Sequence, residues 1–168
     1  SEKEVHEFIG QKAKWIFEKV KEAKENEELI ASKRFDDGHT FLFLGKNFQL
    51  NVRERSVKRS RIEFTGLNWL VDIPINVKNE SKERLIRSKL IQWYRSQAEE
   101  ILGSRIYHYS RVMDLLPKRI AVRSFKRIWG NCDYDTQTIQ LNWQIILSPI
   151  QVVDYVIVHE LCHLVHPN

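Results

Sequence analysis

The spacing of apolar and polar residues changes period along the chain, and each change predicts a different kind of element. Residues 3–28 carry apolar side chains at helical spacing, so we expect an amphipathic helix there. From residue 40 to residue 75 the apolar residues instead form short runs broken by Gly, Asn and Pro, which is typical of strands and turns. The first two strands flank a Gly45-Lys46-Asn47 turn as a hairpin. The four expected strands are Phe41–Leu44, Phe48–Val52, Arg61–Phe64 and Trp69–Ile73.

The second half of the chain combines a long helix with two further strands. Residues 80–116 have an apolar stripe at helical spacing, with Gly103 as a potential break and Pro117 as the end. Strand-like runs follow at Arg119–Phe125 and Thr138–Ile146, and the second alternates cleanly between apolar and polar side chains. No internal repeat, low-complexity segment or linker divides the chain, so we expect one α+β domain over residues 1–168.

A last helix is expected after residue 148. Ser148 can cap it, Pro149 suits the first helical position, and Gln151 completes a Ser-x-x-Gln capping box. The apolar residues from Val152 to Val158 are too continuous for a surface helix. We therefore expect this helix to be buried on most sides.

Composition and cysteine content narrow the function classes. The chain is 42% hydrophobic and 29% charged, which is ordinary for a soluble globular protein. No apolar run approaches the ~18 residues of a membrane span, and the first residues lack the apolar core of a signal peptide. We therefore expect no membrane contact. Two cysteines are too few for a disulfide framework, so we expect a reducing, cytoplasmic location.

The net charge of +5 is compatible with a polyanionic partner but does not require one. The densest basic run of the chain consists of Arg53, Arg55, Lys58, Arg59 and Arg61. Alternate residues of this run point to one side of a strand and could form a stripe. We interpret the run as a solvated sheet face rather than a nucleic-acid surface, since no stacking platform or groove-reading helix accompanies it.

The candidate chemistry lies in the last helix, in His159-Glu160-Leu161-Cys162-His163. Helix residues four apart have β-carbons about 5–6 Å from each other, so His159 and His163 can converge on one Zn²⁺ ion. Glu160 lies about 100° round the helix, where it can reach a metal-bound water. Zinc would acidify that water, and Glu160 would move its proton to the leaving amine. Two core histidines are the alternative, but a capped apolar helix is the context that the metal motif requires.

A third zinc ligand is not evident in the sequence, although a catalytic zinc normally has three protein ligands. His166 shares the face of the other two histidines, but it lies about 10.5 Å along the helix axis from His159. One straight helix cannot bring all three onto one ion, so we interpret His166 as a supporting or rim residue. Cys132 is a weaker alternative ligand, because free cysteines are usually packed and inert.

Taken together, these residues resemble the YgjP-like metallopeptidases, a family of predicted zinc hydrolases related to the SprT-like proteases. The shared stretches near the motif are Trp129-Gly130-x-Cys132, Ile139-x-Leu141-Asn142, Ser148-Pro149, Val153-Asp154-Tyr155-Val156-x-Val158 and His159–Leu164. Earlier matches are Val5-x-x-Phe8-Ile9, Trp15-Ile16, Phe43-Leu44-Gly45 and Trp93-Tyr94-Arg95-x-Gln97-Ala98. The likeness covers nearly the whole chain. It implies a zincin-like fold in which a small sheet packs on helices and the active-site helix is C-terminal.

The chain departs from the family pattern in two respects. Asn131 stands where the family usually has Ser. The family usually continues after the helix with Asn-His-Ser, whose His is its third ligand, and begins with a β-hairpin ahead of the first helix. We therefore expect that the 168 residues are truncated at both ends and that this fragment has weak or no activity.

The resemblance also implies where a substrate would lie. In zincins an edge strand beside the active-site helix pairs with the extended substrate backbone. The likeness assigns that place to Thr138–Ile146, with Asn142 on its polar face. Asn142 equally fits a hydrogen bond that locks the strand to a neighbouring loop. Trp129 fits the core better than a substrate platform.

The leading hypothesis is a cytoplasmic zinc endopeptidase that acts on protein or peptide substrates. The alternative is a nucleic-acid-associated module, or a DNA-linked protease of the SprT type, with a mainly structural metal site. Glu160 separates the two, because a structural site has no use for a carboxylate beside a zinc-bound water.

Overall fold

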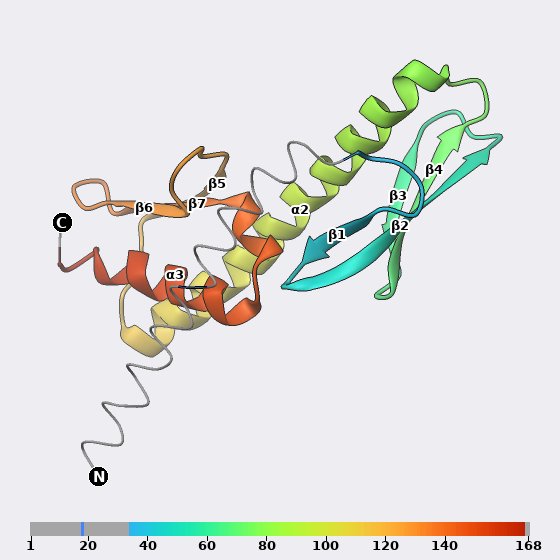
Figure 1. Ribbon diagram of the computed structural model, residues 1–168. Helices are drawn as coiled ribbons and strands as arrows, with labels where there is room; N and C mark the ends of the chain where they lie inside the picture. The colour runs from blue at the N-terminus through green and yellow to red at the C-terminus, as the bar shows by residue number, and fades with distance from the viewer. Residues whose placement is uncertain (1–17, 19–33, 167–168) are drawn as a thin grey trace, which may run out of the picture.

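The computed structural model describes residue 18 and residues 34–166, and it has the predicted α+β architecture: two small mixed sheets and two helices (Figure 1). The first sheet contains β1 (Thr40–Phe43), β2 (Lys46–Arg55), β3 (Arg61–Phe64) and β4 (Asn68–Pro74). The long helix α2 (Asn79–Met113) follows. The rest comprises β5 (Arg119–Arg123), β6 (Gly130–Asp133), β7 (Thr138–Asn142), the 3-10 helix η1 (Trp143–Leu147) and α3 (Ile150–Cys162). Apart from Glu18, the helix expected at residues 3–28 lies outside the described residues.

The first sheet has the strand order β1-β2-β4-β3, with β2 and β4 parallel and the outer pairs antiparallel. The predicted hairpin is confirmed, but its turn is shorter than expected. Lys46 and Asn47 already belong to β2, opposite Phe43 and Leu42. The turn residues are Leu44 and Gly45, with φ angles of 49° and 76°. Two successive left-handed residues are typical of a tight hairpin turn, and glycine adopts that conformation without strain.

Helix α2 connects the two sheets and is about 52 Å long at 1.5 Å per residue. The prediction that Gly103 interrupts it is wrong, since the helix runs through that position. It ends at Met113, where Asp114 adopts a left-handed conformation and donates its N–H to the Ser110 carbonyl. None of the described helices, α2 included, has the length and hydrophobicity needed to cross a membrane. The buried face of α2 is formed by every fourth residue, namely Ile86, Leu90, Tyr94, Ala98, Leu102, Ile106 and Ser110.

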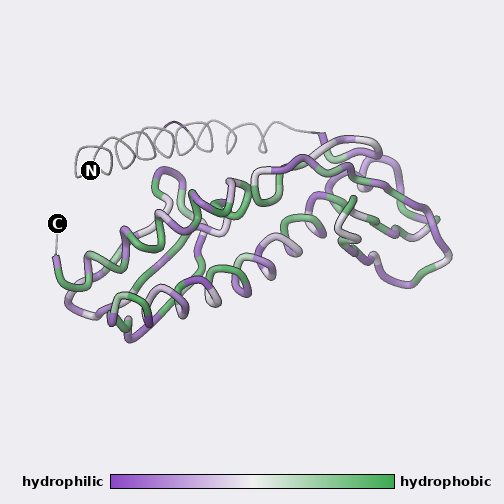
Figure 2. The backbone as a smooth tube through the Cα atoms, turned by 90° about the horizontal axis from the view of Figure 1, so that it is seen from below, coloured by the Kyte–Doolittle hydropathy of each residue, from purple (hydrophilic) through white to green (hydrophobic). Residues whose placement is uncertain are grey.

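The core runs along α2 from the first sheet to η1 and α3, and hydrophobic residues recur along both helices (Figure 2). Tyr94 joins the two halves of this core. Its hydroxyl donates to the Leu42 carbonyl at 2.7 Å, and its ring stacks on Trp143 with 5.9 Å between centroids. Burial raises the pKa of Tyr94 well above its usual value, so the phenol remains a hydrogen-bond donor.

The second sheet has the strand order β5-β7-β6, with β5 parallel and β6 antiparallel to β7. The expectation of one strand over Thr138–Ile146 is wrong, because the strand ends at Asn142 and η1 follows. The Asn142 side chain accepts the N–H of Gln144 at 3.3 Å and so caps η1. Moreover, β7 is the central strand, and the strand that packs against α3 is β6.

Candidate active site

The helix α3 carries the candidate site, and it starts one residue later than its cap residues predicted. Pro149 is the N-cap, and its carbonyl accepts the N–H of Val152 at 2.9 Å. The expected Ser148 cap is wrong. The backbone of Ser148 closes η1 through the Ile145 carbonyl, and its buried hydroxyl has no partner among the described residues. A methyl group on Gly45 would lie 2.7 Å from Pro149 Cγ, so the β1–β2 turn packs directly on the start of the helix.

The helix is buried or partly buried on most sides, as expected, and is open along one face. Gln151, Tyr155 and His159 are exposed at intervals of four residues, so they line one face. The ring of Tyr155 stacks on that of His159, with 6.1 Å between centroids and 21° between planes. The candidate site therefore opens to solvent along this face. The buried residues of the helix are Val152, Val153, Val156, Ile157, Glu160 and Leu161.

His159 and His163 face each other across 3.2 Å, measured between their Nε2 atoms. The Nδ1 atom of His163 lies 3.0 Å from the backbone carbonyl of His166. A carbonyl only accepts, so Nδ1 carries the proton and Nε2 of His163 keeps its lone pair. The carbonyl of His166, rather than its ring, thus orients this histidine. Such an outer hydrogen bond is the usual way in which a metal-binding imidazole is oriented.

The two imidazoles fit a tetrahedral metal. Two nitrogen ligands at zinc distances of about 2.0–2.1 Å lie about 3.3 Å apart at the tetrahedral angle, close to the 3.2 Å observed. The described part of the chain holds no cluster of three or more His, Cys, Asp or Glu side chains placed to hold a metal ion. Burial and the negative charges of Glu160 and Asp133 raise the pKa of the Cys132 thiol, which disfavours the thiolate that a metal ligand needs.

Glu160 lies beside the histidine pair but inside the protein, with 6% of its surface exposed. Its carboxyl group packs against the backbone of Gly130 in β6. A methyl group on Gly130 would lie only 2.7 Å from both Cγ and Oε1 of Glu160, a separation that real side chains do not tolerate. The absence of a side chain at Gly130 therefore creates the space in which the carboxyl group sits. Sequence reasoning missed this role, although Gly130 belongs to the Trp-Gly-x-Cys stretch.

Burial changes the protonation equilibria of the site in the direction that a proton-transfer role needs. It raises the pKa of Glu160, and the nearby His163 partly opposes that effect. Burial also lowers the pKa of His159, and the proximity of His163 lowers it further. The first change makes Glu160 a stronger base, and the second favours the neutral imidazole that binds metals.

Asn142 and Trp129 occupy supporting positions next to the site. Asn142 is fully buried, and its amide group donates to the carbonyls of Phe125 and Ile128 at 3.0 and 3.3 Å. Its backbone N–H donates to the Trp129 carbonyl at 2.8 Å. Trp129 is itself 7% exposed and belongs to the core. These contacts tie the loop before β6 to the central strand, and they favour the locking role of Asn142 over substrate contact.

The Arg105–Asp154 ion pair anchors α3 to α2. The Arg105 guanidinium donates from Nε to Asp154 Oδ1 at 2.6 Å and also to Oδ2, so the contact is bidentate and only partly exposed. We expect Asp154→Ala to lower the free energy of unfolding by about 1–2 kcal/mol. Urea unfolding of both single variants and the double variant is the measurement. If the Arg105→Ala and Asp154→Ala losses simply add, the pair does not couple the helices.

The basic run of β2 and β3 is partly neutralised. Arg53 donates to Asp72 at 2.7 Å, and Arg61 on the other side of β4 lies opposite the same Asp72. Lys58 and Arg59 are exposed in the connection between β2 and β3. This arrangement favours the interpretation of the run as a solvated sheet face.

The comparisons with known proteins give one family. The pattern of the YgjP-like, metallopeptidase domain family matches residues 1–168. No curated protein and no solved structure matches the chain. The match covers the entire sequence, including the helix with the histidine pair and the strand that packs on it. The chain therefore belongs to the YgjP-like metallopeptidase family.

Proposed function

We propose that this chain is a zinc-dependent endopeptidase in which His159 and His163 bind the metal and Glu160 is the general base. Membership in a metallopeptidase family implies a metal ion and a peptide substrate. The observation that carries the finer assignment is the pair of Nε2 atoms at 3.2 Å, next to a buried carboxyl group of raised pKa. Buried carboxyl groups with raised pKa values cluster at catalytic sites.

Each residue has a distinct task in this proposal. Bound zinc would supply Lewis acidity, polarising the scissile carbonyl and acidifying water. Glu160 accepts a proton from the attacking water and delivers it to the nitrogen of the leaving amine. Tyr155 stacks on His159 and restricts its ring, while the His166 carbonyl holds the tautomer of His163. A third ligand would come from outside the described residues, in keeping with the family's His after the helix.

The substrate would lie along the open face of α3, next to β6. Within the described residues β6 has a neighbouring strand only on its β7 side, and it packs against α3. A free strand edge can pair with an extended peptide backbone. We assign the substrate strand to β6 in place of Thr138–Ile146, because β7 already has a strand on both sides.

The metal assignment is tested by the zinc content of the full-length gene product. We expect His159→Ala and His163→Ala each to reduce bound zinc strongly, because each removes one ligand from a site that has few. Elemental analysis after exhaustive dialysis is the measurement. His108→Ala is a matched control, since His108 lies on α2 and contacts Tyr109 rather than the histidine pair. Full zinc retention in the double variant His159→Ala/His163→Ala would place the metal elsewhere.

A further inference from the structure

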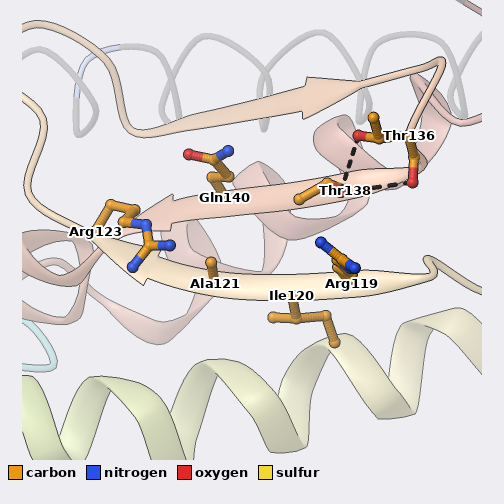
Figure 3. A pocket seen from close by; sticks show the side chains of 7 residues that line it. All are labelled: Arg119, Ile120, Ala121, Arg123, Thr136, Thr138 and Gln140. Carbon is orange, nitrogen blue, oxygen red and sulfur yellow. Dashed lines mark hydrogen bonds between the residues drawn. The ribbon is translucent and has the colours of Figure 1, made fainter.

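Strand β5 borders three hollows that lie away from the histidine pair. The largest, about 460 Å³, is open over the outer side of the second sheet (Figure 3). A second hollow of about 410 Å³ separates β5 from α2 at Gly103, which contributes no side chain to fill it. A third of about 280 Å³ continues past Val122 to Ser124 and Trp143. Arg123 lines all three, and we refer to the three hollows together as the β5 groove. The residues of β5 that line it are Arg119, Ile120, Ala121, Val122 and Arg123.

The groove is positively charged. Arg119 and Arg123 project from β5 on the same side as Thr138 and Gln140 of β7, with the small Ala121 between them (Figure 3). Among the described residues, neither the Arg119 nor the Arg123 guanidinium group makes a hydrogen bond or an ion pair, although the backbones of both residues belong to the β5–β7 pairing. Arg95 lines the α2 side and donates only to Ser124 at 3.3 Å, while Glu99 is the single acidic residue of the lining. Uncompensated guanidinium groups beside a polar hollow favour an anionic ligand.

The backbone of β5 adds a second feature. Within the part of the chain that the structure describes, β5 pairs only with β7 and is an edge strand. The Arg119 N–H donates to the Gln137 carbonyl at 3.4 Å, so the backbone N–H and C=O groups of the odd-numbered residues of β5 point toward β7. Because the direction of the amides alternates along a strand, the N–H and C=O groups of Ile120 and Val122 point to the free edge. An edge with unpaired backbone groups accepts an extended segment as a further strand.

We propose that this groove binds an acidic, extended segment of a partner protein, which adds to the edge of β5. Arg119 and Arg123 lie about 13 Å apart along the strand at 3.3 Å per residue. Two acidic residues four positions apart in the bound segment would therefore face the two arginines. Apolar residues at the second and fourth positions of this five-residue stretch would face Ile120, which is 46% exposed, and Val122. The recognised pattern is acidic, apolar, any residue, apolar, acidic.

The lining favours a peptide over a nucleic acid. Single-stranded nucleic acids bind on exposed aromatic platforms. The one aromatic ring in the lining, Trp143, is 6% exposed and donates its Nε1–H to Ser124. The free backbone edge and the exposed Ile120 instead match the main chain and apolar side chains of an extended peptide. Neither involves the histidine pair, so this proposal does not depend on the peptidase assignment.

The test uses two fluorescent peptides of the same composition and the full-length protein. One contains Glu-Val-Thr-Val-Glu and the other Val-Glu-Thr-Glu-Val, each between Gly-Ser flanks. We expect the first to bind at least about tenfold more tightly in fluorescence anisotropy, because its glutamates meet the arginines and its valines meet the apolar side. A version of the first peptide with alternate N-methylated amides should lose binding, because it cannot pair with the strand edge.

Charge-reversal variants show where the peptide binds. We expect Arg119→Glu/Arg123→Glu to weaken binding of the first peptide by about tenfold or more. The control Arg55→Glu/Arg59→Glu makes the same charge change at two exposed positions away from β5, one at the end of β2 and one in the connection between β2 and β3, and should leave binding unchanged. Equal binding of both peptides, or of the N-methylated peptide, would overturn the proposal. The proposal would also be overturned if the folded protein bound neither peptide, or if an oligonucleotide displaced the bound peptide. The same holds if the protein were a dimer that dissociates in the Arg119→Glu/Arg123→Glu variant, because the groove would then be a contact between two copies of the chain.

Discussion

Glu160→Gln is expected to abolish most peptidase activity while leaving the zinc content of the full-length protein unchanged. The substitution keeps the shape of the side chain but removes the group that accepts and returns the proton. General acid–base catalysis of this kind contributes about a hundred- to ten-thousand-fold in rate, so we expect kcat to fall by that factor. Hydrolysis of an unfolded protein substrate, measured together with zinc stoichiometry, is the readout.

A matched variant separates the loss of a base from a general loss of carboxylate charge. Glu100→Gln removes an exposed carboxylate from α2, away from the histidine pair, and should leave both activity and zinc unchanged. Equal loss of zinc in Glu160→Gln would mean that the carboxylate is a ligand rather than a base. Unchanged kcat in that variant would remove Glu160 from the mechanism.

The elements that could be predicted from sequence are those with a strong local period. The stripe Ile86, Leu90, Tyr94 and Ala98 defined α2, because a buried helix face repeats about every four residues. The hairpin and the strands β3 and β4 were likewise marked by apolar runs between turn residues. The proximity of His159 and His163 could also be predicted from sequence, since two residues four apart on a helix have neighbouring side chains.

What could not be predicted depends on contacts between distant segments. β6 has the residues Gly130-Asn131-Cys132-Asp133, which carry no strand pattern, and it exists because β7 pairs with it. The alternating apolar residues Trp143 and Ile145 are compatible with a strand as well as with η1. The structure has η1 there, and the Asn142 side chain caps it by accepting the N–H of Gln144. Ser148 has the residue type of a cap, but its backbone is already used to close η1.

Gly130→Ala follows from the one site contact that only the fold reveals, and its expected effect is similar to removal of the base itself. The added methyl group would lie 2.7 Å from the Glu160 carboxyl group, so either that group or β6 must move. Displacements of about 1 Å at a catalytic group cost about a hundredfold in rate. We expect kcat to fall by that order while zinc content stays unchanged, because the atoms nearest to the added methyl group all belong to Glu160 and the substitution removes no ligand.

The control for this variant is Gly103→Ala, where an added methyl group meets nothing within 4 Å. It should keep full activity and gain stability, by up to about 1 kcal/mol, since alanine is the better helix former. The decisive measurement is the double variant Gly130→Ala/Glu160→Gln. If Gly130 acts by positioning Glu160, the second substitution adds almost nothing to the loss of kcat, because two changes to one catalytic unit are not additive. A further loss of similar size in the double variant would show that Gly130 supports the sheet instead, and thermal unfolding of the single variant would then reveal the same damage.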